Sequence, residues 1–220
     1  RVIMPPMGSN YATFSGEVSE EMKNYYGLRA KGGTALITVE NACIDYPLAT
    51  NGTKQLRIDS KQFMPGLFEL TERIHKYGAL ASIQLNHAGA SAYPERLGGL
   101  QSVSSSSVPS KAGNPAPRPL TRREILNIVD KYAEAAERAI GAGFDMVEIH
   151  GGHSYLLDQF LSPLYNKRTD EFGGSYENRA RFARLVIEAV RAKVGKWTPV
   201  SFRISADEFI EGGNTLEDTL

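Results

Sequence analysis

Two histidines three residues apart follow a run of residues that is typical of a buried strand. The stretch GFDMVEIHGGHSYLLDQFLSP, residues 143–163, contains His150 and His153, with Tyr155 just behind them. Imidazoles can bind a metal ion, hold a substrate oxygen by hydrogen bonds, or pack in a core. A zinc site needs further ligands, and no third one is evident beside this pair, so we expect no metal ion. The spacing alone is compatible with both catalysis and packing.

Residues able to bind polar groups also follow the other expected strands. In a parallel barrel the carboxyl ends of the strands meet at one mouth, where the chemistry takes place. No acidic cluster there suits magnesium, and no serine or cysteine lies in a nucleophile motif. We therefore expect a mouth that holds a polar heterocycle and a substrate oxygen, rather than a hydrolytic site. Its residues would be Pro5 to Gly8, Glu40, Asn41, Gln84, His87, His150, His153 and Arg203.

Short β-branched runs alternate with longer stretches of helical periodicity, and this alternation predicts parallel strands. The four long helices are expected to begin after Ser19, Ser60, Thr121 and Ser175, each a residue type favoured as an N-cap. A fifth helix would begin near residue 216. The expected strands are residues 2–4, 35–40, 79–85, 145–150 and 199–205.

Five successive βα units without a reversal favour a (β/α)8 barrel over a doubly wound sheet. A closed barrel usually needs about 250 residues, whereas this chain has 220, starts inside a strand and stops inside a helix. We therefore expect residues 1–220 to be one partial barrel domain, truncated at both ends, with no second domain inside the chain. The Pro- and Ser-rich residues 102–120 are expected to form an active-site loop rather than a linker.

Composition narrows the class of partner. The chain has 25 basic and 25 acidic residues and no net charge, so electrostatics gives no reason to expect nucleic acid or a membrane surface. A small molecule is the expected partner. Cys43 is the single cysteine, which excludes an intrachain disulfide and an iron–sulfur cluster built from this chain alone. A reducing compartment and the absence of a long apolar run predict a cytoplasmic location.

Five sequence blocks together resemble the FMN-binding barrel of the old yellow enzyme family, and they cover essentially the whole chain in the family's order. The longest block is similar to a string found in the family's NADH:flavin oxidoreductases. The opening block looks closest to the multidomain branch, which includes 2,4-dienoyl-CoA reductases and enoate reductases. The blocks are RVIMPPMGSNYATFSGEVSEEMKNYYGLRAKGG, ALITVENA, SIQLNHAGA, EIHGGHSYLLDQFLSPLYNKRTDEFGGSYENRARF and SFRISADEF.

The resemblance implies a set of FMN-binding residues. A carboxamide at Gln84 would pair with the pyrimidine edge of the flavin, and the permanent charge of Arg203 would favour the anionic reduced form. Gly8 stands where the family more often has Cys or Thr, and Asn41 stands where it usually has a small residue. On pattern alone Arg203 could instead pair with Glu148 or Asp207. The implied cofactor-binding residues are Pro6, Met7, Gly8, Asn41, Gln84 and Arg203.

The resemblance also implies substrate-binding and catalytic residues. His150 and His153 would bind the oxygen of an activating carbonyl, and Tyr155 would give a proton to the α-carbon. Ser154 replaces the glycine usual before that tyrosine. On spacing alone Tyr155 suits a core position as well as a proton donor, and His87 suits either a loop or a substrate contact.

The implied function is FMN-dependent reduction of the C=C bond of α,β-unsaturated carbonyl compounds with electrons from NADH or NADPH. A flavin-dependent NADH oxidase or an amine dehydrogenase on the same barrel is the alternative within enzymes. The alternative outside enzymes is a barrel fragment that binds no flavin, because the family holds the FMN phosphate after strands seven and eight. A carboxyl-terminal domain with an iron–sulfur cluster and FAD, and a homo-oligomer, are further expectations.

Overall fold

A computed structural model describes residues 2–220, and its main feature is a parallel sheet of five strands. The spatial order β1-β2-β3-β6-β7 is also the order along the chain, so the connections run in one direction without the reversal of a doubly wound sheet. This confirms the predicted succession of βα units. The strands are β1 (Ile3–Met4), β2 (Leu36–Cys43), β3 (Leu80–Asn86), β6 (Met146–Gly151) and β7 (Val200–Ile204).

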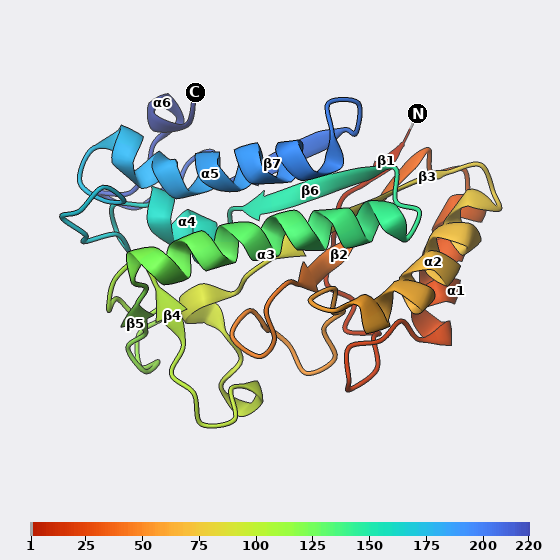
Figure 1. Cartoon of the computed structure of the whole chain (residues 1–220), viewed down its shortest axis with the longest axis horizontal. Coiled ribbons are helices and arrows are strands. Elements are labelled where there is room, and N and C mark those ends of the chain that lie inside the picture. The colour runs from red at the N-terminus through yellow and green to blue at the C-terminus, as the bar shows by residue number, and fades with distance from the viewer. Residues whose placement is uncertain (1) are drawn as a thin grey trace.

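Helices cover the outer side of this sheet, and α3 and α5 run side by side along β6 (Figure 1). Helices α3 and α5 begin at the expected capping residues, Thr121 and Ser175, and Thr121 forms a capping box with Glu124. Ser60 caps a short 3-10 turn, Lys61–Phe63, which leads into α2. The long helices are α1 (Glu20–Lys31), α2 (Met64–His75), α3 (Arg122–Gly141) and α5 (Tyr176–Val194), and the expected last helix is α6 (Leu216–Thr219).

The strands bury apolar side chains toward the helices and turn polar ones to the other face. Side chains alternate between the two faces of a strand, so residues two apart share a face. Ile83 and Leu85 are fully buried in the apolar core, whereas Gln84 belongs to the opposite set. Gln84 is the register partner of Glu148, and His150 is the register partner of Arg203. The polar set thus gathers on the inner face.

Several short elements were not predicted. A two-stranded sheet joins β4 (Val103–Ser104) to β5 (Arg118–Pro119), and a short helix, α4 (Leu156–Leu161), follows β6. A strand of two residues is too short to show a periodic pattern, which explains why β4 and β5 were not predicted. Strand β2 also carries a register shift between Val39 and Ala42, where the extra residue bends the strand beside the mouth of the sheet.

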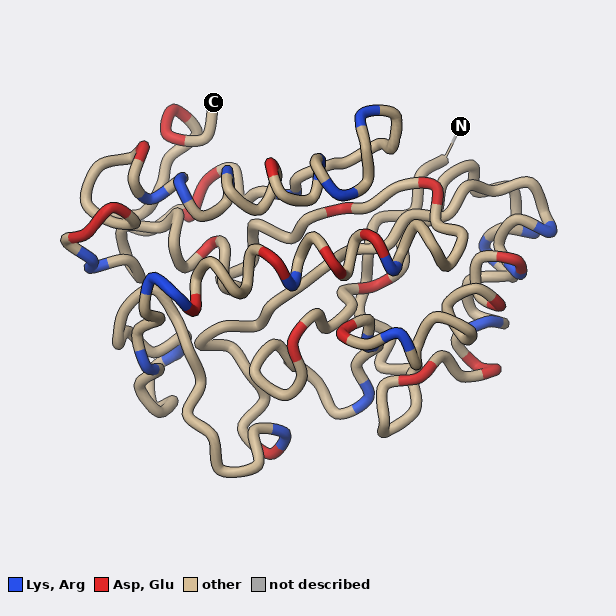
Figure 2. Tube along the Cα trace, in the orientation of Figure 1, with Lys and Arg blue, Asp and Glu red and all other residues tan. Residues whose placement is uncertain are grey.

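Charged residues are spread over the outer surface, with both signs intermingled along α3 and α5 (Figure 2). This distribution fits the equal numbers of acidic and basic residues in the chain. Among residues 2–220, no helix has the length and apolar content needed to cross a bilayer.

Candidate active site

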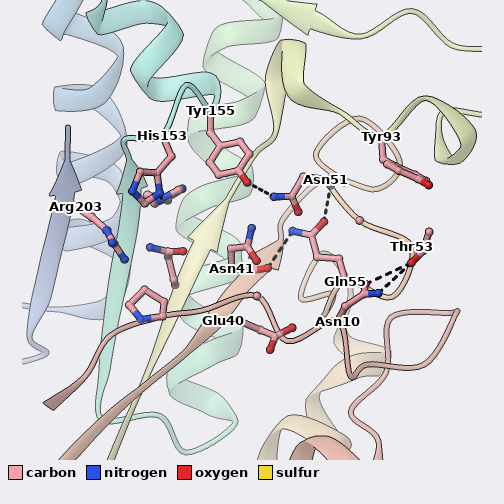
Figure 3. A pocket seen from close by; sticks show the side chains of 15 residues that line it. Asn10, Glu40, Asn41, Asn51, Thr53, Gln55, Tyr93, His153, Tyr155 and Arg203 are labelled. Carbon is pink, nitrogen blue, oxygen red and sulfur yellow. Dashed lines mark hydrogen bonds between the residues drawn. The ribbon is translucent and has the colours of Figure 1, made fainter. Parts of the chain in front are cut away.

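A cavity of about 450 Å³ lies at the carboxyl ends of the strands. It gathers polar side chains from β2, β3, β6 and β7 and from the loops that follow them (Figure 3). Eight of the nine predicted site residues line it, all except Met7, whose side chain is exposed. The lining residues are Pro6, Gly8, Asn10, Glu40, Asn41, Asn51, Gly52, Thr53, Gln55, Gln84, Tyr93, His150, His153, Tyr155 and Arg203.

The two histidines form a hydrogen-bonded pair at the end of β6. His150 Nε2 lies 3.1 Å from His153 Nδ1, and His150 Nδ1 lies 3.1 Å from Oδ1 of the buried Asn86. Burial lowers the pKa of His150 to about 3, helped by His153 and by the positive charge of Arg203. Burial and Arg203 also lower the pKa of His153. Both rings are therefore neutral near pH 7, when imidazole donates one hydrogen bond and accepts one.

A strained turn brings His153 toward His150. His153 and Ser154 have φ angles of 59° and 57°, a left-handed conformation that is uncommon for residues other than glycine. Asp158 holds the turn, because its carboxylate accepts the Ser154 N–H at 2.7 Å, and Ser205 Oγ accepts the His153 N–H at 3.0 Å. Burial raises the pKa of Asp158 to about 6. Ser154 thus adopts the backbone conformation that a glycine would adopt without strain.

Tyr155 lies against the histidine pair, with its ring centroid 4.9 Å from that of His150. Its hydroxyl oxygen accepts a hydrogen bond of 2.5 Å from Nδ2 of Asn51, which comes from the loop after β2 (Figure 3). Tyr155 is therefore not a core residue, because its hydroxyl group faces the cavity.

Gln84 and Arg203, on the strands that flank β6, differ in hydrogen bonding: Gln84 can offer an acceptor and Arg203 only donors. Gln84 is almost fully buried, and its Nε2 donates to Glu148 Oε1 at 2.7 Å. Arg203 makes no ion pair within residues 2–220, so the alternative of a structural pair with Glu148 or Asp207 is not realised. The cation is left to face the cavity.

Gly8, which follows β1, lies close to Asn41 of β2. A β-carbon added at Gly8 would lie 3.6 Å from Asn41 Oδ1, which is an ordinary contact. Glu40, next to Asn41, is buried and accepts hydrogen bonds from Ser9 and Tyr26. Burial raises the pKa of Glu40. This carboxyl group ties the segment after β1 to the sheet and so positions Gly8.

Six lining residues were not predicted, and five of them come from the chain after β1 and β2. Nothing in their types or spacing indicated a site, since Asn, Thr and Gln are ordinary loop residues. These residues are Asn10, Asn51, Gly52, Thr53, Gln55 and Tyr93.

Two sequence-based interpretations are decided by the tertiary structure. His87 is fully buried behind the cavity, where its Nδ1 accepts the Gly89 N–H at 3.1 Å, so it takes the loop role. Residues 102–120 do not line the cavity either. Ser104 and Ser105 in this segment are buried and donate to Gln159 of α4, so the segment supports the turn after β6 from behind.

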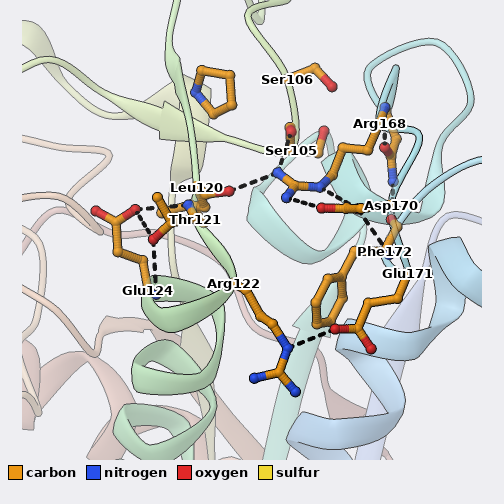
Figure 4. Close-up of polar contacts among 12 residues, drawn as sticks. Ser105, Ser106, Leu120, Thr121, Arg122, Glu124, Arg168, Asp170, Glu171 and Phe172 are labelled. Atoms are coloured by element: carbon orange, nitrogen blue, oxygen red, sulfur yellow. Dashed lines mark hydrogen bonds and ion pairs between the residues drawn. The ribbon is translucent and has the colours of Figure 1, made fainter.

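The charged group near residue 170 is structural. Arg168 donates to the carbonyl oxygens of Ser105 and Leu120 and pairs with Asp170 (Figure 4). Arg122 at the start of α3 pairs with Glu171 at 2.7 Å. These contacts fasten residues 102–120 to the loop before α5. Within the described part of the chain, no three His, Cys, Asp or Glu side chains gather as metal ligands.

Comparison with known proteins decides the family. The sequence pattern of the "NADH:flavin oxidoreductase / NADH oxidase family" matches residues 1–220. The chain belongs to this family. The NADH oxidase of Thermoanaerobacter brockii is 48% identical over 218 residues, which are 99% of this chain and 34% of that protein.

Two solved structures confirm the old yellow enzyme resemblance and the partial (β/α)8 barrel. The Old Yellow Enzyme from Pichia sp. AKU4542 superposes with a TM-score of 0.90 at 32% identity, over 99% of this chain and 58% of that one. Morphinone reductase superposes with a TM-score of 0.89 at 32% identity, over 99% of this chain and 61% of that one. The chain therefore spans about a third of the NADH oxidase and less than two thirds of these two enzymes.

The residues of the cavity fit the flavin that this family binds. A flavin ring presents hydrogen-bond donors and acceptors along its pyrimidine edge and gathers negative charge there on reduction. Gln84 has its oxygen uncommitted, because the amide nitrogen is the atom that Glu148 holds. Arg203 offers a cation without a carboxylate partner in residues 2–220, and Gly8 lines the cavity with no side chain of its own.

Proposed function

We propose that the chain is the substrate- and FMN-binding part of an NAD(P)H-dependent oxidoreductase that reduces the C=C bond of α,β-unsaturated carbonyl compounds. The observation that carries the proposal is the neutral His150–His153 pair, which lines one cavity together with Tyr155, Gln84 and Arg203. Hydrogen-bond donors, a proton donor and a flavin-binding set are the groups that such a reduction requires.

FMN would be held by Gln84, by Arg203 and by the segment from Pro6 to Gly8, whose backbone would contribute at Met7. Asn41, beside Gly8, would complete this side of the cavity. When bound, FMN would supply a hydride that originates from NADH or NADPH. These residues contribute orientation and charge, since the permanent charge of Arg203 stabilises negative charge on any ligand placed against it.

The histidine pair would bind the carbonyl oxygen and draw electrons from the C=C bond. A neutral imidazole has only one N–H, so its second nitrogen needs a suitable partner. Asn86 Nδ2 has no hydrogen-bond partner within residues 2–220. Turning the amide would let Nδ2 donate to His150 Nδ1 and place the ring hydrogen on Nε2, which a substrate oxygen would take over from His153 Nδ1. The β-carbon then accepts the hydride, and Tyr155 gives its hydroxyl proton to the α-carbon.

The proposal is tested with the double variant H150A/H153A of the flavin-loaded protein. We expect 2-cyclohexenone reduction to fall by about a hundredfold or more, because stabilisation of a developing oxyanion is typically worth that much. Reduction of the flavin by NADH should change far less. The loss of flavin absorbance measures this half-reaction. Equal losses in both half-reactions would contradict the assigned role of the histidines.

Reduction of oxygen is the second candidate, because the relative from T. brockii is named an NADH oxidase. Oxygen has no carbonyl group to bind, so this reaction does not need the histidine pair. Oxygen consumption that survives in H150A/H153A, together with negligible enone reduction by the unsubstituted protein, would favour the oxidase. An amine dehydrogenase has no observation in its favour here.

A fragment that binds no flavin is the non-enzymatic alternative. Titrating the purified chain with FMN separates this alternative from the proposed enzyme. Quenching of flavin fluorescence measures the binding. Quenching that is lost in Arg203→Ala would support the proposed site, and the absence of any quenching would favour an interaction domain. The expected iron–sulfur cluster, the FAD, the multidomain placement and the homo-oligomer concern more than this chain and stay predictions.

A further inference from the structure

Asn51 is the one lining residue that contacts the hydroxyl group of Tyr155. Its Nδ2 donates to the phenol oxygen at 2.5 Å, although the two residues are 104 positions apart in the chain. Because the phenol oxygen accepts this hydrogen bond, its own hydrogen is free to point elsewhere into the cavity. The contact therefore leaves the hydroxyl group able to donate.

A chain of hydrogen bonds fixes Asn51 in this position. Gln55, which is buried, donates from Nε2 to the backbone oxygen of Asn41 at 3.0 Å. Gln55 Oε1 accepts the Asn51 backbone N–H at 2.8 Å (Figure 3). The backbone of Asn51 is thus anchored through Gln55 to strand β2. A mobile loop residue would lack this anchorage.

Tyr155 is fixed equally well at its backbone. It is the N-cap residue of α4, its carbonyl accepts the Gln159 N–H at 2.8 Å, and its ring packs on His150. Both partners of the hydrogen bond are therefore held by independent parts of the fold. Such a contact turns the phenol proton away from Asn51 Nδ2.

We infer that Asn51 is a positioning residue for proton transfer, which orients the Tyr155 hydroxyl group and stabilises the oxyanion left after the proton is given away. The inference rests on the proposed function, in which Tyr155 is the proton donor. In the step itself the O–H bond of Tyr155 breaks and a C–H bond forms at the α-carbon. The two electrons of the reduction arrive with the hydride at the β-carbon, and solvent later returns a proton to the phenolate.

Other ionisable groups also line the cavity. They stay unchanged when Asn51 is substituted, so a matched pair of variants isolates the hydrogen bond. Asn51→Asp keeps the shape but replaces the N–H donor by a carboxylate, whereas Asn51→Leu removes all hydrogen bonding. The other groups are Glu40 of β2, His150 and His153 after β6, Arg203 of β7 and Tyr93.

The first measurement needs no flavin. In protein labelled with ¹³Cζ-tyrosine, the Tyr155 resonance is assigned by its loss in Tyr155→Phe. We expect this resonance at neutral pH to move in both Asn51 variants, while Asn114→Asp leaves it in place, because Asn114 is exposed, contacts Ser110 and does not line the cavity. A resonance that stays unchanged in Asn51→Asp and Asn51→Leu would overturn the inference.

The second measurement is the pH profile of 2-cyclohexenone reduction by the flavin-loaded protein. A hydrogen bond to a charged oxygen is worth roughly one to two pH units of protonation equilibrium. We therefore expect the alkaline limb to move up by about one unit in Asn51→Leu and by more in Asn51→Asp, with lower kcat and nearly unchanged KM. A loss confined to KM would overturn the inference. Full turnover by Tyr155→Phe would instead overturn the role of Tyr155 in the proposed function, and the role of Asn51 with it.

Discussion

Gln84 Nε2 donates to Glu148 Oε1 at 2.7 Å, across the pair of neighbouring strands β3 and β6. The two side chains share the inner face of the sheet because they are register partners. Glu148 can only accept when ionised, so it decides which end of the Gln84 amide faces away from it. The cavity consequently receives the Gln84 oxygen as a fixed acceptor.

Removing that carboxylate should weaken FMN binding. We expect Glu148→Leu to raise the dissociation constant by about fivefold to tenfold, because a net hydrogen bond is worth about 1 kcal/mol. Glu148→Gln should bind nearly as well as the unsubstituted protein, since its amide oxygen still accepts from Gln84. Quenching of flavin fluorescence measures both. Equal affinity for all three proteins would show that Glu148 does not orient Gln84.

The low pKa of His150 predicts acid instability. Burial lowers this pKa from 6.5 to about 3, so below pH 6.5 the unfolded chain binds a proton at this site that the folded chain does not. The free energy of unfolding should therefore fall as pH drops from 6.5 toward 3, by up to about 1.4 kcal/mol per pH unit from this group.

Asp158 changes stability in the opposite sense, because its raised pKa, about 6, favours the folded state as pH falls below that value. A comparison with His150→Gln separates the contribution of His150 to the pH dependence of stability from that of Asp158. Urea unfolding at several pH values should show the unsubstituted protein losing stability relative to His150→Gln below pH 6.5, with no such difference above pH 7. A parallel loss in both proteins would contradict the burial of a neutral His150.

Asn86 offers a way to raise the pKa of His150. An aspartate in its place would put a negative charge about 3 Å from His150 Nδ1, where the Asn86 oxygen now lies at 3.1 Å. A nearby opposite charge favours the protonated ring and raises such a pKa by about 1 to 3 units. We expect ¹⁵N chemical shifts of the His150 ring in Asn86→Asp to report this rise during a pH titration. Asn86→Leu is the control without the charge and should not show it.

Gly151 is required by packing at the end of β6. A β-carbon there would lie 2.1 Å from Cζ of Phe202 on the neighbouring strand β7. We expect Gly151→Ala to destabilise the fold by about 1 to 3 kcal/mol, the usual effect of overpacking. Urea unfolding of Gly151→Ala in a Phe202→Leu background should recover part of this loss, because the ring is then absent. Strictly additive losses would contradict a direct clash.

Much of the barrel could be predicted from local sequence. The capping box of Thr121 and Glu124, and the apolar spacing behind Ser175, determine where α3 and α5 begin. Predicted and observed strands differ by one to three residues at their ends, as with β2, which was expected at 35–40 and spans Leu36–Cys43. The bulge in β2 escaped prediction because it depends on pairing with β3 rather than on the residues of β2.

The sequence by itself determined which residues lie at the carboxyl ends of the strands, since that follows from strand position alone. His150, Gln84 and Arg203 were therefore predicted for one mouth, and the cavity contains all three. The tertiary structure alone decided the partners of these residues. Asn51 meets Tyr155, Glu148 meets Gln84 and Asn86 meets His150 through contacts between distant segments. No local periodicity encodes such contacts, because they depend on strand register and loop path, and these set the direction of each hydrogen bond in the site.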